Sequence, residues 1–233
     1  MELNEKHSGG DGNMWYIEKV NLFSIFCPHK FADFKEEHQF KNYKKGEFIY
    51  FTDDPSNSIY LLVEGKVKIL YYTDEGSEVI KSVLTSGDVF GELSILGEEK
   101  RKDFAIVVQD NTSICQLTID QMQELMKKNL NFALKINKLI GLRIRKLERR
   151  VDSLVFKDVR TRMLEFIREF AEEKGEEKGE SYQINHFLTH KDMADLIGTT
   201  RQTVTTLLNE MKSEGLIDFG RRSIYVPNIK ALS

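Results

Sequence analysis

The sequence has very little cysteine and no long apolar run. Two cysteines, Cys27 and Cys115, occur in 233 residues, which excludes a disulfide framework and favours a reducing compartment. No apolar run approaches the length of a membrane-spanning helix, and the first residues do not form a signal-peptide pattern. We therefore expect a cytoplasmic protein that does not enter a membrane.

Histidine is absent from the whole stretch between His38 and His186. Metal-dependent β-roll enzymes hold their metal with two or three histidines and a carboxylate that converge from neighbouring strands. The strands expected between residues 44 and 117 lie inside this stretch and have no histidine to offer. The chain also lacks a GxxxxGK[ST] phosphate loop and a Gly-x-Ser-x-Gly nucleophile motif. We therefore expect a protein that is not an enzyme.

The composition is otherwise that of an ordinary globular protein, with 40% hydrophobic and 30% charged residues. The length suffices for two modest domains, each with its own core. The net charge of −3 contrasts with the basic character of many DNA-binding proteins, but an acidic run over residues 172–180 offsets a more basic neighbourhood. Net charge therefore neither supports nor excludes a nucleic-acid partner.

Residues 44–117 have the pattern of an all-β domain. Short runs rich in β-branched and aromatic residues alternate with turn signals that contain glycine, aspartate or proline. These runs cover residues 48–51, 59–63, 67–72, 79–84 and 105–108. Strands at this spacing predict a sandwich or double-sheet roll that encloses a small cavity. An open meander without a ligand is the alternative.

A long helix is expected next, from near Ile119 or Phe132 through Leu154. Along it, side chains recur at intervals of three and four residues, which is the seam of a coiled coil. After Asn137 the seam consists of Ile140, Ile144, Leu147, Val151 and Leu154. We expect a parallel homodimer to bury it and so to hold two DNA-reading domains about one helical turn of DNA apart. Packing of the seam on the β-roll of its own chain is the alternative.

Residues 189–227 predict a winged helix-turn-helix. Thr189 and Asp192 form a capping box at the start of one helix, and Gly198 allows a sharp turn after it. A second helix follows within two residues, with an apolar face at i, i+3, i+4 and i+7 from Val204. Two strands, at 216–219 and 223–226, then form a hairpin with a cationic tip.

The opposite face of that second helix carries side chains that recognise DNA. Arginine pairs with guanine, glutamine and asparagine pair with adenine, and threonine contacts either base or phosphate. A helix exposed only for solubility usually carries glutamate and lysine instead. The expected DNA contacts are Thr189, Thr200, Arg201, Gln202, Thr203, Thr205, Thr206, Asn209, Arg221 and Arg222. An ordinary helix pair with a hairpin is the alternative.

Taken in order, these parts resemble the family of the cyclic-AMP receptor protein and the fumarate/nitrate regulator. The resemblance starts near Asn21 and rests on residues 64–67, on Gly-Asp-Val-Phe-Gly-Glu-Leu at 87–93, on the long helix and on residues 192–204. It implies an α+β chain with a tail over 1–20, a jelly-roll (double-stranded β-helix) sensor domain of the cyclic-nucleotide-binding kind over 21–130, a dimerisation helix over 131–155 and a winged helix-turn-helix over 156–233.

The resemblance also implies a function. It implies a homodimer that responds to an effector, binds a near-palindromic site in double-stranded DNA and contacts RNA polymerase. Arg201 matches the family's first reading arginine, so we expect it to contact guanine. Gln202 and Thr206 stand where the cyclic-AMP receptor protein has a Glu and an Arg, so the DNA half-site should differ from that protein's. A dimerisation module whose reading domain no longer recognises sequence is a second class of function.

The effector pocket implied by the resemblance consists of Gly91, Glu92, Leu93, Arg101, Lys102 and Asp103. In cyclic-nucleotide-binding members the Gly-Glu-Leu segment holds ribose and phosphate, and an Arg-Ser pair ten residues on clamps the phosphate. Lys102 and Asp103 stand at the clamp, so a carboxylate would face the phosphate. Leu147 and Glu148 replace the Thr-Ser pair that touches adenine.

We therefore expect the pocket not to hold cyclic AMP in the usual pose. Glu92 would then serve as a structural acceptor for backbone N–H groups of its loop. A nucleotide-responsive regulator with an unusual phosphate clamp, in which Arg101 or Lys102 compensates for Asp103, is the alternative. In either case we expect a signal at the roll to shift its packing against the long helix, and a hinge over residues 152–158 to reposition the reading domains.

Redox and haem sensing are other themes of the family. The fumarate/nitrate regulator holds an iron–sulfur cluster with four cysteines, and this chain has only two, so we do not expect that cluster. Each cysteine should instead be a small buried hydrophobe. Haem binding stays open as a further alternative, because His29 and His38 in the N-terminal region could reach the roll. His186 and His190 are spaced like a metal pair, but the helix start at Thr189 already accounts for that segment, and we expect no metal there.

Overall fold

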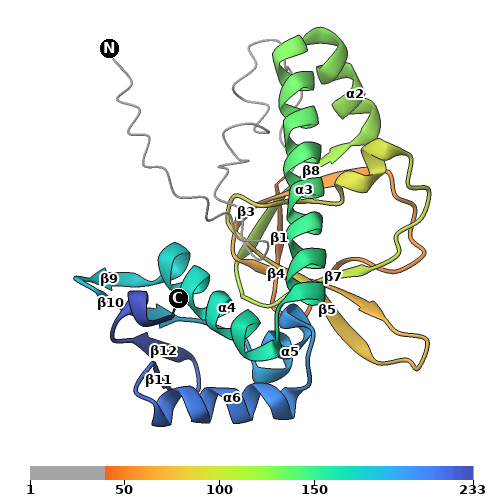
Figure 1. Cartoon of the computed structure of the whole chain (residues 1–233). Coiled ribbons are helices and arrows are strands. Elements are labelled where there is room, and N and C mark those ends of the chain that lie inside the picture. The colour runs from red at the N-terminus through yellow and green to blue at the C-terminus, as the bar shows by residue number, and fades with distance from the viewer. Residues whose placement is uncertain (1–39, 233) are drawn as a thin grey trace, which may run out of the picture.

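The structure is a computed structural model that describes residues 40–232, apart from the side chains at positions 131, 135, 139, 142, 146, 173 and 174. A β-roll, a long helix and a smaller domain with its own sheet follow one another along the chain (Figure 1). The expected tail over residues 1–20, together with Cys27, His29 and His38, lies outside the described residues. Between residues 40 and 232 no helix is long and apolar enough to cross a membrane. The α+β fold class is confirmed.

The roll consists of two four-stranded antiparallel sheets within the described residues. One sheet has the strand order β1-β8-β3-β6 and the other the order β2-β7-β4-β5. Their bounds are β1 Phe40–Tyr43, β2 Phe48–Tyr50, β3 Ser58–Glu64, β4 Lys66–Tyr72, β5 Glu78–Thr85, β6 Val89–Phe90, β7 Phe104–Val107 and β8 Thr112–Thr118, with a short 3-10 helix, η2, over Glu92–Leu96. Side chains such as Leu62, Val67 and Ile114 fill the space between the sheets. This confirms the expected double-sheet roll.

A tight turn at Gly65 joins β3 to β4. Its φ of 103° lies in the left-handed region that favours glycine. A Cβ at this position would also lie 2.1 Å from Oγ1 and 2.8 Å from Cα of Thr112 on β8. The glycine in the Glu-Gly-Lys-Val segment is therefore required both by the turn and by the close approach of another strand.

Two helices replace the single long one that a start at Ile119 would have given. The first, α2, covers Ile119–Lys128, and the second, α3, covers Leu130–Phe156. Asn129 between them is extended, with φ −137° and ψ 99°, and its side chain accepts a hydrogen bond from the backbone N–H of Phe132 at 3.0 Å. An asparagine in this role is an N-cap, so it ends one helix and starts the next.

The C-terminal domain is a winged helix-turn-helix, as expected. It consists of α4 Val159–Lys174, β9 Glu176–Lys178, β10 Ser181–Asn185, α5 His190–Ile197, α6 Arg201–Ser213, β11 Asp218–Phe219, β12 Ser223–Val226 and the 3-10 helix η3 Ile229–Leu232, with the sheet order β11-β12-β10-β9. Thr189 and Asp192 form the predicted capping box, and Gly198 adopts a φ of 71° at the turn. The apolar face of α6 is buried in the core of the domain.

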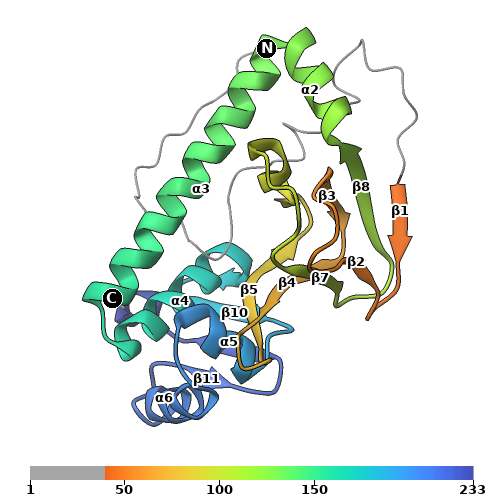
Figure 2. The same cartoon turned by 90° about the vertical axis from the view of Figure 1, so that its right-hand side faces the viewer.

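This domain packs against the roll through a shared core, and the views of Figures 1 and 2 both place it at one end of the roll beside β4 and β5. Leu70, Ile80 and Phe104 of the roll belong to the same buried cluster as residues of α4, α5 and α6. At the boundary, Lys68 Nζ lies 2.6 Å from Asp192 Oδ2, with side-chain exposures of 16% and 8%. Asp195 adds a second contact, because its Oδ2 accepts a hydrogen bond from the backbone N–H of Ile80 at 3.2 Å.

Candidate DNA interface and effector pocket

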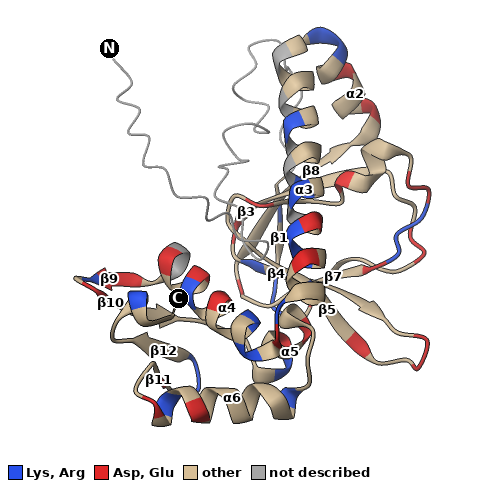
Figure 3. Cartoon of the chain, viewed as in Figure 1, with Lys and Arg blue, Asp and Glu red and all other residues tan. Residues whose placement is uncertain are grey.

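The second helix of the helix-turn-helix, α6, presents a polar face to solvent. Its apolar residues, Val204, Leu207, Leu208 and Met211, are buried. Arg201, Gln202, Thr206 and Asn209 are exposed. Figure 3 shows charged residues near the two ends of α6 and none in its middle. The exposed centre of α6 is therefore polar and uncharged, which suits hydrogen bonds to base edges better than general attraction to phosphate.

The other threonines expected at DNA also serve the protein itself. Thr189 Oγ1 accepts a hydrogen bond from the backbone N–H of Asp192 at 3.1 Å, and Thr200 Oγ1 accepts one from Thr203 at 3.1 Å. The hydroxyls of Thr200 and Thr203 lie 2.9 Å apart. Thr205 donates to the carbonyl of Arg201 at 3.0 Å and lies 2.9 Å from Nδ1 of His190. These side chains fix the starts of α5 and α6 and hold the two helices together.

The wing presents two cations. Arg221 and Arg222 are exposed in the turn between β11 and β12. The backbone carbonyl of Arg222 accepts a hydrogen bond from the backbone N–H of His186 at 2.9 Å, which ties the wing to the segment before α5. The wing also shares the core of the domain with α6 through Ile224, Leu207 and Leu208, so the exposed polar side chains of both are available to a common partner.

A small cavity of about 70 Å³ lies inside the roll next to Gly91. The structure brings five of the six expected effector residues to its wall: Gly91, Glu92, Leu93, Arg101 and Asp103. Lys102 is exposed and is not part of this wall. The wall also contains Tyr50, Lys81, Glu98 and Arg143, which the sequence pattern did not indicate.

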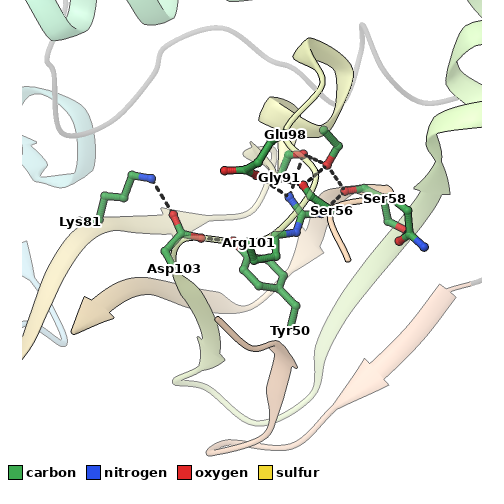
Figure 4. Close-up of polar contacts among 10 residues, drawn as sticks. Tyr50, Ser56, Ser58, Lys81, Gly91, Glu98, Arg101 and Asp103 are labelled. Atoms are coloured by element: carbon green, nitrogen blue, oxygen red, sulfur yellow. Dashed lines mark hydrogen bonds and ion pairs between the residues drawn. The ribbon is translucent and has the colours of Figure 1, made fainter. Parts of the chain in front are cut away.

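Arg101 is turned inward and is only 2% exposed (Figure 4). It donates hydrogen bonds to the carbonyl of Gly91 at 3.2 Å and to the carbonyl of Ser58, and its Nη1 lies 3.7 Å from Oε2 of Glu98. The guanidinium also stacks over the ring of Tyr50 at 4.6 Å. Arg101 therefore joins the two sheets and the loop before η2.

Asp103 does not face the cavity as a free carboxylate. Its Oδ1 accepts a hydrogen bond from the hydroxyl of Tyr50 at 3.0 Å, and its Oδ2 lies 2.6 Å from Nζ of Lys81 (Figure 4). Burial, and then the charge of Asp103, raises the pKa of Tyr50, so the phenol stays protonated and continues to donate. The charge that compensates Asp103 thus comes from Lys81 rather than from Arg101 or Lys102.

Glu92 has a partner on the long helix. Its Oε1 lies 3.5 Å from Nε of Arg143 on α3, and Arg143 also donates to the carbonyl of Val89 at 2.7 Å. The expectation that Glu92 accepts hydrogen bonds from the backbone of its own loop is replaced by this ion pair, which links the effector pocket to α3. No sequence pattern indicated this pair, because Arg143 is one of many cations along the helix.

The expected dimer seam on α3 is divided between two environments. Ile140 is half-buried and packs against the roll with Phe132 and Ile136. Ile144, Leu147 and Val151 are 53%, 62% and 58% exposed, and Leu154 is 44% exposed. The alternative of packing on the chain's own roll therefore applies to Ile140, whereas the rest of the seam leaves an apolar stripe open.

The junction between α3 and α4 is tied to the reading domain. Lys157 is extended there, and buried Arg162 on α4 donates to its carbonyl at 2.8 Å. The same guanidinium donates to the carbonyls of Ile197 at 2.9 Å and Gly198 at 3.2 Å, at the end of α5. A change of direction at this junction therefore moves α4 and α5 together.

The remaining cysteine and histidine candidates have structural surroundings. Cys115 is 2% exposed and lies in the apolar core of the roll, as expected for a small buried hydrophobe. His186 is buried and His190 contacts Thr205, so they do not converge on one point. Residues 40–232 contain no group of histidine, cysteine, aspartate and glutamate side chains that could hold a metal ion. The expectations about haem and the iron–sulfur cluster depend on residues outside this part of the chain and stay predictions.

Comparison with known families decides the assignment of the chain. Residues 40–129 match the cyclic nucleotide-binding domain, and residues 161–233 match the Crp-like helix-turn-helix domain. The chain belongs to the Crp/Fnr family. As a member, it is a transcription regulator that combines an effector-binding domain with a DNA-binding helix-turn-helix.

Relatives of the Crp/Fnr family align with nearly the whole chain. The global nitrogen regulator of Synechococcus elongatus is 29% identical over 196 residues, which cover 84% of this chain and 88% of the relative. The CRP-like cAMP-activated global transcriptional regulator of Mycobacterium tuberculosis is 22% identical over 217 residues, 93% of this chain and 96% of the relative. A variant of CooA from Carboxydothermus hydrogenoformans has the same fold, with a TM-score of 0.77, 24% identity and coverage of 95% and 98%.

Replacing Arg101 should test its structural role. We expect Arg101→Met to lower the free energy of unfolding by about 3–5 kcal/mol, because Glu98 and two backbone carbonyls would lose a buried charged partner. The neighbouring exposed Lys102→Met is the control and should change it by no more than about 0.5 kcal/mol. Urea denaturation of the ligand-free protein gives both values, and similar losses for the two variants would contradict the role of Arg101.

Proposed function

We propose that the chain acts as a homodimer that binds a near-palindromic site in double-stranded DNA and is controlled by a signal at the roll. The observation that carries the proposal is the division of α6. One face completes the core, and the opposite face exposes Arg201, Gln202, Thr206 and Asn209. A helix-turn-helix reads bases in the major groove with such a second helix, while the wing arginines contact the backbone.

Dimerisation is supported by the apolar stripe on α3. Ile144, Leu147, Val151 and Leu154 are spaced by three, four and three residues and are exposed in the single chain. Burying an apolar side chain of this size contributes about 1.5–3 kcal/mol, so a second copy of the same helix gains by covering the stripe. Pairing two copies along α3 would place two α6 helices on one duplex, which explains why a near-palindrome is the proposed site.

A signal at the roll has two physical routes to the reading domain. The first passes from Glu92 through Arg143 to α3 and then through the junction held by Arg162. The second is direct, through the ion pair of Lys68 and Asp192. A ligand or partner that changes either set of contacts would shift the populations of the orientations that the reading domains adopt. The spacing between the two α6 helices would change with them.

We propose that cyclic AMP in the usual pose is not the signal. The cavity of about 70 Å³ is about half the size of one that accommodates a benzene ring, and a cyclic nucleotide is much larger than benzene. Arg101 is committed to carbonyls of the protein and Lys81 to the carboxylate of Asp103, so neither of these two cations is left to hold a phosphate. The mycobacterial relative is named as a cAMP-activated regulator. The alternative is therefore that this pocket binds cyclic AMP with a rearranged phosphate clamp.

The remaining parts of the proposal follow from family membership. We propose that the regulator works in the cytoplasm, where DNA is available, that it contacts RNA polymerase, and that it is not an enzyme. The proposed effector can be haem or a redox signal. It is not a four-cysteine iron–sulfur cluster, because the chain has two cysteines.

Selection of bound duplexes from a random pool tests the function as a whole. We expect the purified protein without ligand to enrich an inverted repeat, and added cyclic AMP to leave the enriched sequence and its yield unchanged. Enrichment only with cyclic AMP would overturn the inference that cyclic AMP is not the signal. If a dimer forms but neither condition enriches any sequence, the chain is a dimerisation module whose reading domain no longer recognises sequence.

Two arginines should have different effects on DNA binding. Arg201→Ala should weaken binding by about 1–3 kcal/mol and relax the preference at one base pair, because a bidentate contact to guanine is lost. Arg221→Ala should weaken binding to all sequences alike and reduce the salt dependence, as expected for a phosphate contact. Competition titrations at several salt concentrations separate the two effects. Uniform weakening by Arg201→Ala would make that residue a phosphate contact.

The stripe on α3 should be required for dimerisation. We expect Leu147→Glu to shift the protein to monomers and to abolish binding to the inverted repeat, because two carboxylates would face each other across the seam. Leu134→Glu is the control, since Leu134 is a 55% exposed leucine on the same helix but lies outside the seam. Analytical ultracentrifugation gives the oligomeric state. Dimers that survive Leu147→Glu would exclude this seam as the interface.

A further inference from the structure

His190, the first residue of α5, joins three elements of the reading domain. Its Nδ1 lies 2.9 Å from Oγ1 of Thr205 on α6, and its ring lies edge to face with that of Phe219 on β11, with the centroids 6.1 Å apart. The side chain is half-buried between them. It therefore lies where the two helices of the helix-turn-helix meet the wing.

The contact with Thr205 fixes which nitrogen of His190 carries a proton. The hydroxyl of Thr205 has one proton, which it donates to the carbonyl of Arg201 at 3.0 Å. Its oxygen therefore accepts a hydrogen bond from Nδ1–H of the imidazole. Nε2 is left as the nitrogen that gains or loses a proton, and in the neutral ring it can only accept.

Nε2 of His190 is open to solvent. Within residues 40–232 it makes no hydrogen bond, and it is not one of the enclosed side-chain atoms of this range that lack a partner. The acids of α5 and β11 are each paired with a lysine: Asp192 with Lys68, Asp195 with Lys191 and Asp218 with Lys212. A proton on Nε2 therefore has no carboxylate of these two elements to stabilise it.

The other charged group close to the ring is a cation. Arg201 lies at the start of α6, and His186, before α5, is the remaining titratable neighbour. Burial, and then the charge of Arg201, lowers the pKa of His190, so the ring of the free protein is neutral at about pH 7. An anion at Nε2 would act against both causes and favour the charged ring.

The position of His190 places Nε2 beside the proposed DNA surface. In a helix-turn-helix the N-terminal part of the second helix enters the major groove, and the first helix crosses the sugar-phosphate backbone. His190 starts the first helix and contacts Thr205, which is bonded to Arg201 at the start of the second. The roll contacts α5 through Asp192, which points to nearly the opposite side because it is two residues further along the helix. Nε2 is therefore on the side where a bound duplex presents phosphates.

We propose that DNA binding takes up one proton per half-site at His190, with Nε2 then donating a hydrogen bond to a phosphate oxygen of the duplex. The proton comes from the solvent, and Nδ1 keeps its hydrogen bond to Thr205 throughout. The inference rests on the proposed function and adds a dependence on pH to it. His190 thus holds α5 against α6 in the free protein and becomes a positive contact only on DNA.

The direction of the pH dependence follows from this proton uptake. The phosphate raises the pKa of His190 in the complex above its value in the free protein, so binding is stronger at low pH. The gain is complete below the pKa of the free protein and is lost as the pH rises through the pKa of the complex. Each unit by which the pKa rises corresponds to at most about tenfold in affinity per half-site.

The test is a titration of the full chain with a duplex that carries the inverted repeat, at about pH 8 and about pH 6 and at constant salt. We expect the unaltered protein to bind at least about tenfold more tightly at the lower pH, because a dimer takes up two protons. His190→Asn keeps a side-chain N–H for Thr205 but cannot take up a proton. It should match the unaltered protein within about threefold at the higher pH and change by less than about twofold between the two.

Lys191→Gln is the matched control. Lys191 is an exposed cation next to His190, and lysine side chains do not titrate between these pH values. The change should therefore leave the ratio of the two affinities as it is in the unaltered protein. Urea unfolding at both pH values shows whether each variant is folded.

Nuclear magnetic resonance of the unaltered protein follows the proton directly. The Cε1–H resonance of His190, assigned by its absence in His190→Asn, should titrate at higher pH in the complex than in the free protein. This measurement does not depend on the affinity of any variant.

Three outcomes would overturn the inference alone. They are equal binding of the repeat by the unaltered protein at both pH values, full pH dependence in His190→Asn, and a His190 resonance that titrates at the same pH with and without DNA. In each case the duplex is still bound, so the proposed function stands. A protein that binds no duplex at either pH would overturn the proposed function and this inference together.

Discussion

The buried carboxylate of Asp192 is the constraint on which the arrangement of the two domains depends. Its Oδ2 accepts a hydrogen bond from the backbone N–H of Thr189 at 2.8 Å and also lies 2.6 Å from Nζ of Lys68 on the roll. The first contact starts α5, and the second holds α5 against β4. A carboxylate that loses its partner while buried costs several kcal/mol, so the helix start and the domain contact are coupled.

This boundary between the domains is suited to two arrangements, one with the reading domain docked on the roll and one with it moved away. If the reading domain moves away from the roll, water reaches Asp192 and replaces the ammonium of Lys68, while the hydrogen bond from Thr189 keeps α5 intact. The apolar contacts of Leu70, Ile80 and Phe104 oppose the movement, because they would be exposed with it. A ligand shifts the balance between the two arrangements only by the difference in its affinity for them.

The effector pocket shows why local sequence motifs were insufficient there. The Gly-Glu-Leu segment and the later basic residues were recognised in the sequence, and the structure brings five of the six expected residues together. The partners that determine their roles come from distant strands and helices: Lys81 and Tyr50 for Asp103, and Arg143 for Glu92. Such pairings depend on how the two sheets and α3 pack against one another. The spacing of residues along the sequence does not show this packing.

Local signals, by contrast, predicted the elements that depend on neighbouring residues. The capping box at Thr189, the turn at Gly198 and the apolar face of α6 each involve residues within one or two turns, and the structure has all of them. Three strands of the roll lie outside the predicted runs: β1 is mostly exposed, β6 has two residues, and polar side chains interrupt the apolar pattern of β8. The sequence pattern left the start of the long helix open between Ile119 and Phe132. The extended backbone of Asn129 and its side-chain cap separate α2 from α3.

The position of α3 explains how one helix serves several parts of the molecule. Arg143 and Ile144 are adjacent in sequence, but the first reaches the wall of the effector pocket and the second lies on the open stripe. At the far end of the helix, Leu154 approaches the turn of the helix-turn-helix so closely that a Cβ at Gly198 would lie 2.7 Å from its Cδ2. A rotation of α3 on the roll would therefore change the pocket, the stripe and the packing of the turn together. Because packed side chains resist continuous deformation, such a helix favours a small number of discrete orientations over a graded response.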